Sequence, residues 1–470
     1  MPFNSLRFFL VFPVIFGVYW AIPARCNLWR KLFLILASYL LYMNWNPAFA
    51  IVLLGVTMVT FWGGLVCGGG NEKGKRHLIW VFAILGLLPL LVFKYYNFLN
   101  DNVSAGLSAL GLHFSMPGLN WAVPVGISFF TFQAVGYMLD VYHGRVKAER
   151  NLVDYLLFVS FFPQITSGPI SRADELLPQI KRENTFNYSQ AVSGMRYLLW
   201  GMFLKVVIAD RAGIYVDTVF DSYERFSGAG CAIAAVLYSF QIYADFAGYS
   251  LMAIGVSKTL GFDLIENFNR PYLAASVSEF WKRWHISLTR WLTRHVYIPL
   301  GGNRRGTART YLNILITFLV SGIWHGANWT FIVWGCLHGL FLIVERIFGW
   351  QRKDSEGLVK ASRVLVTFVV VTLAWVVFRS PSISDAAALF GRFAAAGGQL
   401  ITKGSVGHLI YCLSGLLFLL SYESLKEYFP ESYNRLANRK GIRWATYLVL
   451  FSMILLIGVL DGSSFIYVGF

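Results

Sequence analysis

The chain of 470 residues is poor in charged residues and in cysteine. Charged residues make up 14% of it, whereas soluble domains contain about 25%, so an ordinary soluble protein is excluded. Its few cysteines are scattered and lack the spacing of a disulfide framework or a metal site, so we expect no metal. No ten-residue stretch alternates between apolar and polar residues, which excludes a membrane β-barrel. We also find no internal repeat and no separate soluble domain.

The sequence is instead rich in long runs of apolar residues. Hydrophobic residues make up 56% of the chain, aromatic residues 17%, and the mean hydropathy is +0.56. A membrane span needs about 20 apolar residues, and a backbone in lipid must satisfy its own hydrogen bonds. The pattern therefore predicts an all-α polytopic membrane protein with roughly ten to twelve transmembrane helices and some re-entrant pieces. Residues 1–470 are expected to form one domain.

The charge balance is basic, with 40 Lys and Arg against 24 Asp and Glu. The basic residues cluster in short loops at 25–31, 73–76 and 145–150, whereas the segments 44–47 and 97–119 contain no Lys or Arg. This alternation follows the positive-inside rule. It predicts that the N-terminus and C-terminus lie on the outer side, and it argues against nucleic acid as a partner.

A histidine lies inside the apolar stretch 311–347, in the tripeptide Trp324-His325-Gly326. An ionisable group at the centre of a span costs about 2.5–3.5 kcal/mol even on lenient scales, and imidazole exchanges protons near neutral pH. His325 is therefore a candidate catalytic base near the middle of a helix. Packing between helices is an equally open interpretation, and for His338 packing is favoured.

The segment 279–297 predicts one basic amphipathic helix. At 100° per residue its tryptophans fall on one face together with His285 and His295, and its cations fall on the opposite face. We expect His285 to point into the protein and His295 to be structural. The cations expected to meet phosphates of lipid or ligand are Lys282, Arg283, Arg290 and Arg294 on this helix, followed by Arg304.

Two further features lie at membrane depth. Asp245 is a charge within an apolar run, and we expect it to pair with a nearby arginine. Pro and Gly interrupt the run 161–169, which predicts re-entrant backbone lining a cavity. The acidic segment 210–224 is expected to be an outer loop.

Three motifs resemble the membrane-bound O-acyltransferase (MBOAT) superfamily, most of all its bacterial alginate O-acetyltransferase branch. They are FWKRWHIS at 280–287, YIPLGGNR at 297–304 and GIWHGANW at 322–329, with further similarity in PVGISFFTFQ at 124–133, FPQ at 162–164 and GPI at 168–170. The resemblance implies a ring of helices around a central funnel, with the catalytic and re-entrant region at about 279–346. It also implies that His325 is the catalytic histidine and His285 the second motif histidine.

The resemblance further implies a substrate and partners. Acetyl-CoA would enter from the cytoplasm as acetyl donor, with no bound cofactor, and Trp324, Asn328, Lys282, Arg283 and Arg304 would contact substrate. The acetyl group would reach a periplasmic acceptor or an esterase-like (SGNH-type) protein that modifies a polysaccharide at the bacterial inner membrane. At the C-terminus, Phe465, Tyr467 and Phe470 are expected to dock such a partner or to anchor the chain at the lipid interface.

The acceptor stays open at this point. Leu251 follows Gly248-Tyr249-Ser250, where the alginate branch has Asp, and the segment 166–169 is similar to the D-alanyl transferase of teichoic acid. The predicted function is O-acetylation of alginate or a related exopolysaccharide, with peptidoglycan O-acetylation or teichoic acid D-alanylation as alternatives. A polysaccharide or lipid transporter, with the histidines as a proton relay, and a scaffold are the alternatives from other classes. A transporter is disfavoured because the chain has no repeated halves with matching broken helices.

Overall fold

The computed structural model describes residues 2–68, 72–112, 116–350 and 356–460. Within these ranges the regular structure is helical, and the only β-type pairing is an isolated bridge between Phe226 and Gln399. The prediction of an all-α membrane protein is confirmed.

The helices of the N-terminal half are α1 (Leu6–Ala21), α2 (Asn27–Met43), α3 (Pro47–Gly68), α4 (Glu72–Leu90), α5 (Tyr96–Ala109), α6 (Ile127–Tyr142), α7 (Leu152–Ser160), α8 (Phe162–Ile165), α9 (Ala173–Lys181), α10 (Tyr188–Met202), α11 (Asp210–Phe220) and α12 (Gly228–Thr259). Those of the C-terminal half are α13 (Val277–Arg283), α14 (Ile286–Leu292), α15 (Thr307–His325), α16 (Trp329–Ile347), α17 (Gly357–Arg379), α18 (Ile383–Arg392), α19 (Val406–Tyr428), α20 (Pro430–Asn438) and α21 (Lys440–Ile457). Three π-helical turns interrupt this series, namely η2 (Leu91–Tyr95), η3 (Phe203–Ala209) and η6 (Thr293–Tyr297). The 3-10 turns are η1 (Ala24–Cys26), η4 (Tyr223–Arg225), η5 (Pro271–Leu273) and η8 (Lys403–Ser405).

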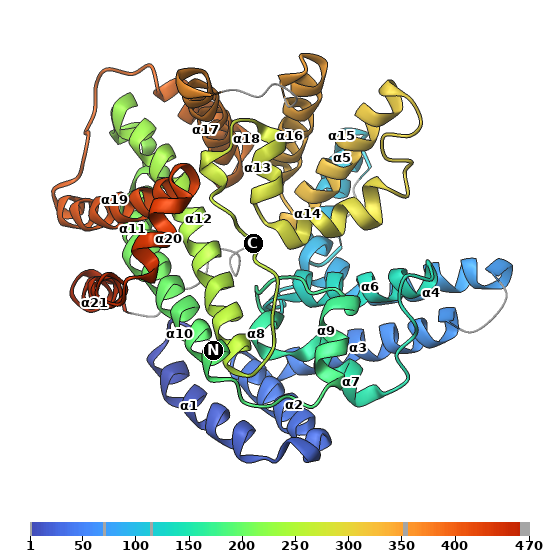
Figure 1. The fold of residues 1–470 in the computed structure, drawn as a ribbon. Coiled ribbons are helices and arrows are strands. Elements are labelled where there is room, and N and C mark those ends of the chain that lie inside the picture. Colours follow the sequence, from blue (N-terminus) through green and yellow to red (C-terminus); the bar gives the residue numbers. More distant parts are fainter. Residues whose placement is uncertain (1, 69–71, 113–115, 351–355, 461–470) are drawn as a thin grey trace.

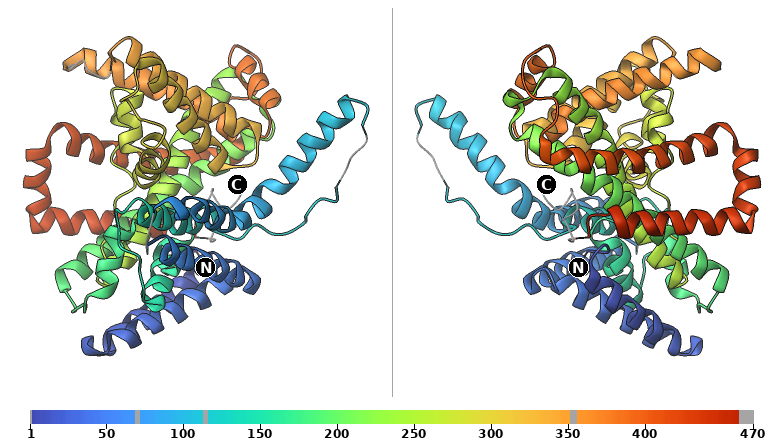
Figure 2. Two further views of the ribbon diagram at one scale, coloured as in Figure 1. Left: turned by 90° about the vertical axis from the view of Figure 1, so that its right-hand side faces the viewer. Right: turned by 90° about the vertical axis from the view of Figure 1, so that its left-hand side faces the viewer.

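The helices are arranged around a central region (Figure 1). In that view α1 and α2 lie at the bottom, α3, α4 and α6 at the lower right, α15 to α17 at the top, and α19 to α21 at the left. The side views show α5 and the hairpin of α19 to α21 projecting outward from the body (Figure 2). Helices α12, α13, α14 and α6 meet near the middle, and α6, α13 and α14 carry most of the motifs 124–133 and 280–287.

In the described part of the chain, eight helices are long and apolar enough to cross a membrane, or nine if the bent pair α1 and α2 forms one span. The expected ten to twelve spans are therefore not confirmed. The reason is that several apolar runs are broken into short helices rather than continuous spans. The run 152–170, for example, forms α7, of nine residues, six of them buried, and α8, of four, all of them buried.

The acidic segment predicted as an outer loop is helical instead. Helix α10 continues through η3 into α11, so Asp210 begins a helix rather than a loop. The Lys205 Nζ atom lies 2.8 Å from Asp210 and 2.6 Å from Asp245, and all three side chains are buried. The expectation that Asp245 pairs with an arginine is therefore wrong, since its partner is the lysine of the π-helical turn.

Candidate active site

The motif 280–287 does not form the single amphipathic helix that its periodicity predicts. Helix α13 ends at Arg283, and α14 begins at Ile286. Between them the backbone pairs with a distant loop: the N–H of Asn269 donates to the Arg283 carbonyl oxygen, and the N–H of Ile286 donates to the Asn267 carbonyl oxygen, both at 2.9 Å. The helix breaks because these backbone groups find partners outside it.

His285 lies at this break in a left-handed conformation, with φ of 41°. Residues other than glycine rarely adopt this region, and they do so mostly at functional sites. The Asn267 side chain helps to hold the turn, since its Oδ1 atom accepts the Ser287 N–H at 3.1 Å. A specific local geometry therefore presents the His285 imidazole to the interior.

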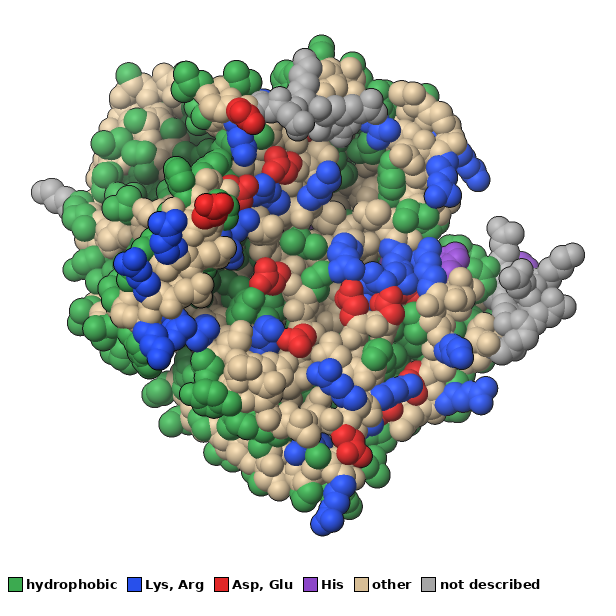
Figure 3. Space-filling view, in the orientation of Figure 1, with side chains coloured by type: hydrophobic (Ala, Val, Ile, Leu, Met, Phe, Trp, Pro, Cys, Tyr) green, Lys and Arg blue, Asp and Glu red, His purple; other side chains and the backbone are tan. Residues whose placement is uncertain are grey.

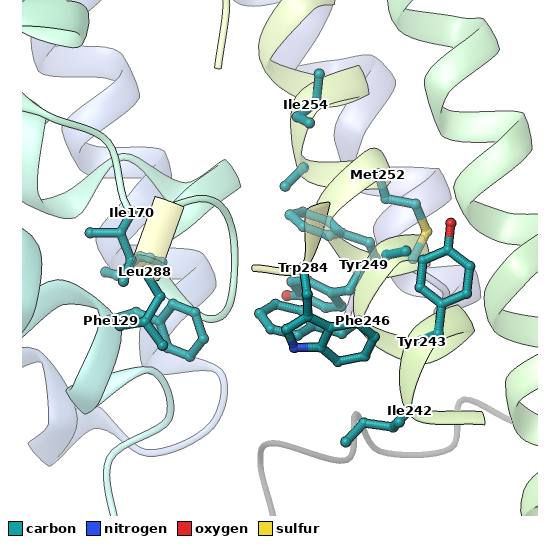
Figure 4. Close-up of a cluster of buried hydrophobic side chains, with 14 of the residues drawn as sticks. Phe129, Ile170, Ile242, Tyr243, Phe246, Tyr249, Met252, Ile254, Trp284 and Leu288 are labelled. Carbon is teal, nitrogen blue, oxygen red and sulfur yellow. The ribbon is translucent and has the colours of Figure 1, made fainter. Parts of the chain in front are cut away.

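The imidazole of His285 is surrounded by aromatic rings. Its centroid lies 4.6 Å from the Phe246 ring of α12, 5.6 Å from the Trp324 ring of α15 and 6.2 Å from the Phe129 ring of α6. Figure 4 shows Phe129 and Leu288 on one side of this cluster and Phe246 and Trp284 on the other. The side chain is 1% exposed, and neither ring nitrogen has a hydrogen-bond partner among the described residues. The prediction that His285 points into the protein is thus confirmed, although the helix is not continuous.

His325 is the last residue of α15 and not the middle of a span, as the apolar stretch suggested. Gly326 is extended, and Asn328 then caps α16 by accepting the Thr330 N–H at 3.0 Å. The imidazole lies edge-on to Trp334 at 5.0 Å and to Phe378 at 5.2 Å between centroids. The helical run therefore ends at the histidine itself, before α16 begins.

Trp324 connects the two histidines. Its ring centroid lies 4.9 Å from that of His325 and 5.6 Å from that of His285. The structure thereby brings together, on one indole and among buried aromatic rings, two histidines that are 40 positions apart in the sequence. Buried imidazoles of this kind can accept and return a proton while water is kept away from the reacting groups.

A small cavity of about 30 Å³ opens beside His325. Its walls come from the backbone around Gly126, from Ser128, from Thr166 and Ser167 after α8, and from Lys94 of η2. The cavity agrees with the prediction that the Pro- and Gly-rich segment 161–169 lines a space inside the protein. Gly126 is required there, because its φ is +76° and a Cβ atom would lie 2.2 Å from the Ile165 carbonyl oxygen.

The cations of 279–297 are mostly engaged with carboxylates. Arg283 lies 2.6 Å from Glu279 and 2.7 Å from Glu427, and the other pairs are Arg290 with Glu175 at 2.8 Å and Arg294 with Asp140 at 2.6 Å. Figure 3 shows this mixture of basic and acidic side chains on one face of the molecule. In the described part of the chain, Lys282 and Arg304 are exposed and form no ion pair. These two are the predicted substrate cations that remain accessible.

The remaining predicted residues have structural contacts. Asn328 also donates to the Pro381 carbonyl oxygen at 2.8 Å. His338 accepts the Trp281 indole N–H at 3.2 Å, in line with a packing role, and His295 packs on Trp291 at 4.8 Å between centroids. Phe465, Tyr467 and Phe470 lie outside the described residues. No group of three or more His, Cys, Asp or Glu side chains in the described ranges could hold a metal ion.

Two residues at this site, Lys94 and Asn267, were not among those predicted from the sequence. A lysine inside the apolar helix run 77–109 was a readable signal, because charges at membrane depth usually have a function. Asn267 lies in a loop, and only the folded chain shows that it holds the His285 turn.

The chain is similar to a known family and to several named proteins. Residues 148–382 match the MBOAT, membrane-bound O-acyltransferase family. Probable alginate O-acetylase AlgI of Pseudomonas putida is 37% identical over 407 residues, which cover 86% of this chain and 82% of that protein. Peptidoglycan O-acetyltransferase of Helicobacter pylori is 36% identical over 415 residues, with 82% and 78% covered. Teichoic acid D-alanyltransferase of Streptococcus thermophilus is 28% identical over 341 residues, with 66% and 77% covered.

The names of these relatives all describe acyl transfer and differ in the polymer that they give. The two O-acetyltransferases are similar to this chain to almost the same degree. From the matched family region and from the extent of these identities, the chain belongs to the membrane-bound O-acyltransferase family and is a multi-pass membrane acyltransferase.

Proposed function

We propose that this protein transfers an acetyl group from acetyl-CoA to a hydroxyl of a cell-envelope polysaccharide, with His325 as general base. The observation that carries the proposal is the convergence of His325 and His285 on Trp324 within a buried aromatic shell. Neither histidine lies in the middle of a continuous helix: His325 is the last residue of α15, and His285 occupies a strained turn. Strained backbone of this kind is retained where it has a role in the mechanism.

In the proposed reaction the His325 imidazole takes the proton of the acceptor hydroxyl as its oxygen attacks the thioester carbonyl. The carbon–sulfur bond then breaks, and the imidazolium returns its proton to the departing CoA sulfur. A positioned base contributes about 10²–10⁴-fold to the rate. Holding thioester and hydroxyl together in a narrow, dry site supplies much of the remainder.

His285 has a different proposed role from His325. Its ring nitrogens have no partner among the described residues, so one N–H is available to the thioester oxygen. A donor directed at the oxygen on which negative charge develops is worth about 10²–10³-fold. His285 would therefore stabilise the tetrahedral intermediate rather than move the proton. Trp324 would complete the wall against which the acetyl group rests, and Asn328 would fix the backbone beyond His325.

The donor would be recognised through its phosphates. Lys282 and Arg304 are exposed and unpaired in the described structure, so they can meet the phosphate groups of CoA without first breaking an ion pair. Arg283 is held by two carboxylates, and its contribution would be to the shape of the site. The positive-inside pattern of the loops supports a cytoplasmic donor side.

The acceptor side would face the periplasm. The proposed setting is the bacterial inner membrane with both termini periplasmic, where a periplasmic esterase-like (SGNH-type) protein accepts the acetyl group and passes it to alginate or a related exopolysaccharide. Peptidoglycan is a second candidate polymer, since a peptidoglycan O-acetyltransferase is almost as similar to the chain as the alginate proteins are. The tail residues Phe465, Tyr467 and Phe470 would contact such a partner.

Consumption of the thioester tests this proposal against transport. Purified protein in detergent is mixed with acetyl-CoA and a thiol reagent, with and without an oligosaccharide acceptor. We expect slow release of CoA thiol that increases with acceptor, and O-acetyl product detected by mass spectrometry. The His77→Ala variant is the control, because His77 is exposed and lines neither the cavity beside His325 nor the larger cavity that Trp324 also lines. Absence of both thiol and product, together with uptake of the oligosaccharide by proteoliposomes, would favour a transporter.

A further inference from the structure

Side chains from one distant turn hold the end of the helix that carries His325. The carbonyl oxygens of Ile323, Trp324 and His325 are at the C-terminal end of α15, where carbonyls lack partners within the helix. The Lys94 Nζ atom donates to the Trp324 oxygen at 3.0 Å and to the His325 oxygen at 2.7 Å. The neighbouring Tyr95 hydroxyl donates to the Ile323 oxygen.

The turn that supplies these donors is itself unusual. Lys94 and Tyr95 belong to the π-helical turn η2, which directly follows Pro89 and Leu90 within the span 77–109. Proline removes a backbone donor and disturbs the helix, and π-helical turns are frequent at functional sites. This local change of register presents two adjacent side chains to the same helix end, more than 220 residues further along the chain.

Lys94 is a lysine within the span 77–109, with no carboxylate within 4 Å among the described residues. A lysine there is costly, and such residues are usually retained for a function. Its remaining contact is the Ser128 hydroxyl at 3.4 Å, so each of the three ammonium hydrogens has an oxygen to meet. An ammonium group that is fully engaged has no donor left for a ligand. Its contacts are instead with the backbone of the catalytic residue.

We infer that Lys94 is a positioning residue for His325, and the inference rests on the proposed function. The partial negative charge at the C-terminal end of a helix attracts a cation. By binding the Trp324 and His325 oxygens together, the ammonium group fixes the direction in which the imidazole leaves the backbone. The same group lines the cavity beside His325, so it fixes the histidine relative to the space that the acceptor hydroxyl enters. Tyr95 holds the preceding carbonyl and completes the clamp.

Replacement of Lys94 by methionine tests the inference. Lys94→Met keeps the length of the side chain and removes the charge and the donors. We expect kcat for acetyl transfer to fall by roughly 100-fold, the loss typical of a reacting group displaced by about 1 Å. The KM for acetyl-CoA should stay within about twofold, because Lys94 contacts the Trp324 and His325 carbonyl oxygens and is not one of the cations proposed to bind CoA phosphates. Lys94→Arg, which keeps the charge and donors, should recover most of kcat.

A matched control separates positioning from stability. Lys31→Met makes the same change at a partly buried lysine of α2, which pairs with Asp154 of α7 at 2.6 Å. Helices α2 and α15 lie on opposite sides of the molecule in Figure 1. It should leave kcat unchanged. Tyr95→Phe, with Tyr96→Phe as its neighbour control, tests the clamp by a smaller change, and we expect a fall in kcat only for Tyr95→Phe.

Two results would overturn the inference. One is wild-type kcat in Lys94→Met. The other is a loss of activity that follows a loss of thermal stability and that Lys94→Arg does not relieve, which would make Lys94 structural only. Measuring His325→Ala in the same series keeps the two proposals apart. If His325→Ala remains active, the proposed function fails; if it is inactive while Lys94→Met is normal, only the role of Lys94 fails.

Discussion

Gly322 on α15 lies so close to the Phe331 carbonyl oxygen on α16 that a Cβ atom at Gly322 would be 2.3 Å from it. The two helices flanking the His325 break therefore touch through backbone. Small residues permit such approach in membrane proteins. The contact fixes the angle between α15 and α16 directly beside His325.

Gly322→Ala should lower both stability and activity, because a methyl group cannot be accommodated without separating the helices. Overpacking of this kind costs about 1–3 kcal/mol. The measurement is the thermal unfolding midpoint in detergent, together with kcat. Gly17→Ala is the matched control, since nothing lies within 4 Å of its Cβ position on α1. Equal midpoints for the two variants would contradict this reading of the contact.

Asn267→Ala should reduce kcat through His285. The variant removes the acceptor for the Ser287 N–H and the donor to the Ser250 hydroxyl at 3.2 Å, both next to the strained turn. We expect a fall of about 10-fold or more in kcat, because the N–H of His285 would no longer be directed at the thioester. Asn269→Ala is the control, since Asn269 is exposed and contributes through its backbone. If both variants keep full activity, the Asn267 side chain has no part in placing His285.

Stability should fall as the pH is lowered, in part because of His295. Burial lowers the pKa of His295 to about 4, although Asp140 opposes the shift. The unfolded chain, with a histidine pKa of about 6.5, then binds the proton more readily than the folded protein. The stabilisation by His295 is complete above pH 6.5 and is lost as the pH falls towards 4, by about 1–2 kcal/mol at pH 5.

This predicted fall in stability is tested by measuring the thermal unfolding midpoint at pH 7.5 and at pH 5. His295→Gln removes the titrating group, so its unfolding midpoint should differ less between pH 7.5 and pH 5 than that of the wild type. A larger difference in the variant would mean that His295 is not buried as a neutral side chain.

Loss of the two cations that are proposed to bind the phosphates of acetyl-CoA should change the KM for acetyl-CoA and not kcat. Lys282→Ala combined with Arg304→Ala should raise the KM for acetyl-CoA by at least roughly tenfold, because each charged hydrogen bond contributes about 1.5–3 kcal/mol. The effect should shrink at high salt. Arg7→Ala, an exposed cation on α1, is the control and should change neither constant. An unchanged KM in the double variant would place the donor phosphates elsewhere.

Much of the fold and site could be predicted from local sequence. Composition predicts the membrane-embedded helical class, and the motif histidines predict the site. The end of α15 at His325 was also readable, because Gly326 is a helix stop signal and Asn328 an N-cap signal. The apolar stretch outweighed these signals in the prediction of one span.

The features that escaped prediction depend on partners distant in sequence. The break at His285 exists because residues 267–269 supply hydrogen bonds to residues 283–287, and the periodicity of the segment contains no trace of that. The same holds for the identity of the partner of Asp245, which is Lys205 in a π-helical turn. Such features depend on contacts between residues that are separated in the sequence, and the local sequence pattern carries no information about those contacts.

The most direct test of the account is the turnover of His325→Ala beside its binding of acetyl-CoA. We predict that acetyl-CoA-dependent O-acetylation falls by at least about 10²-fold, while acetyl-CoA binding and the thermal unfolding midpoint stay close to those of the wild type. O-acetylation at the wild-type rate by His325→Ala would contradict the assignment of His325 as the catalytic base.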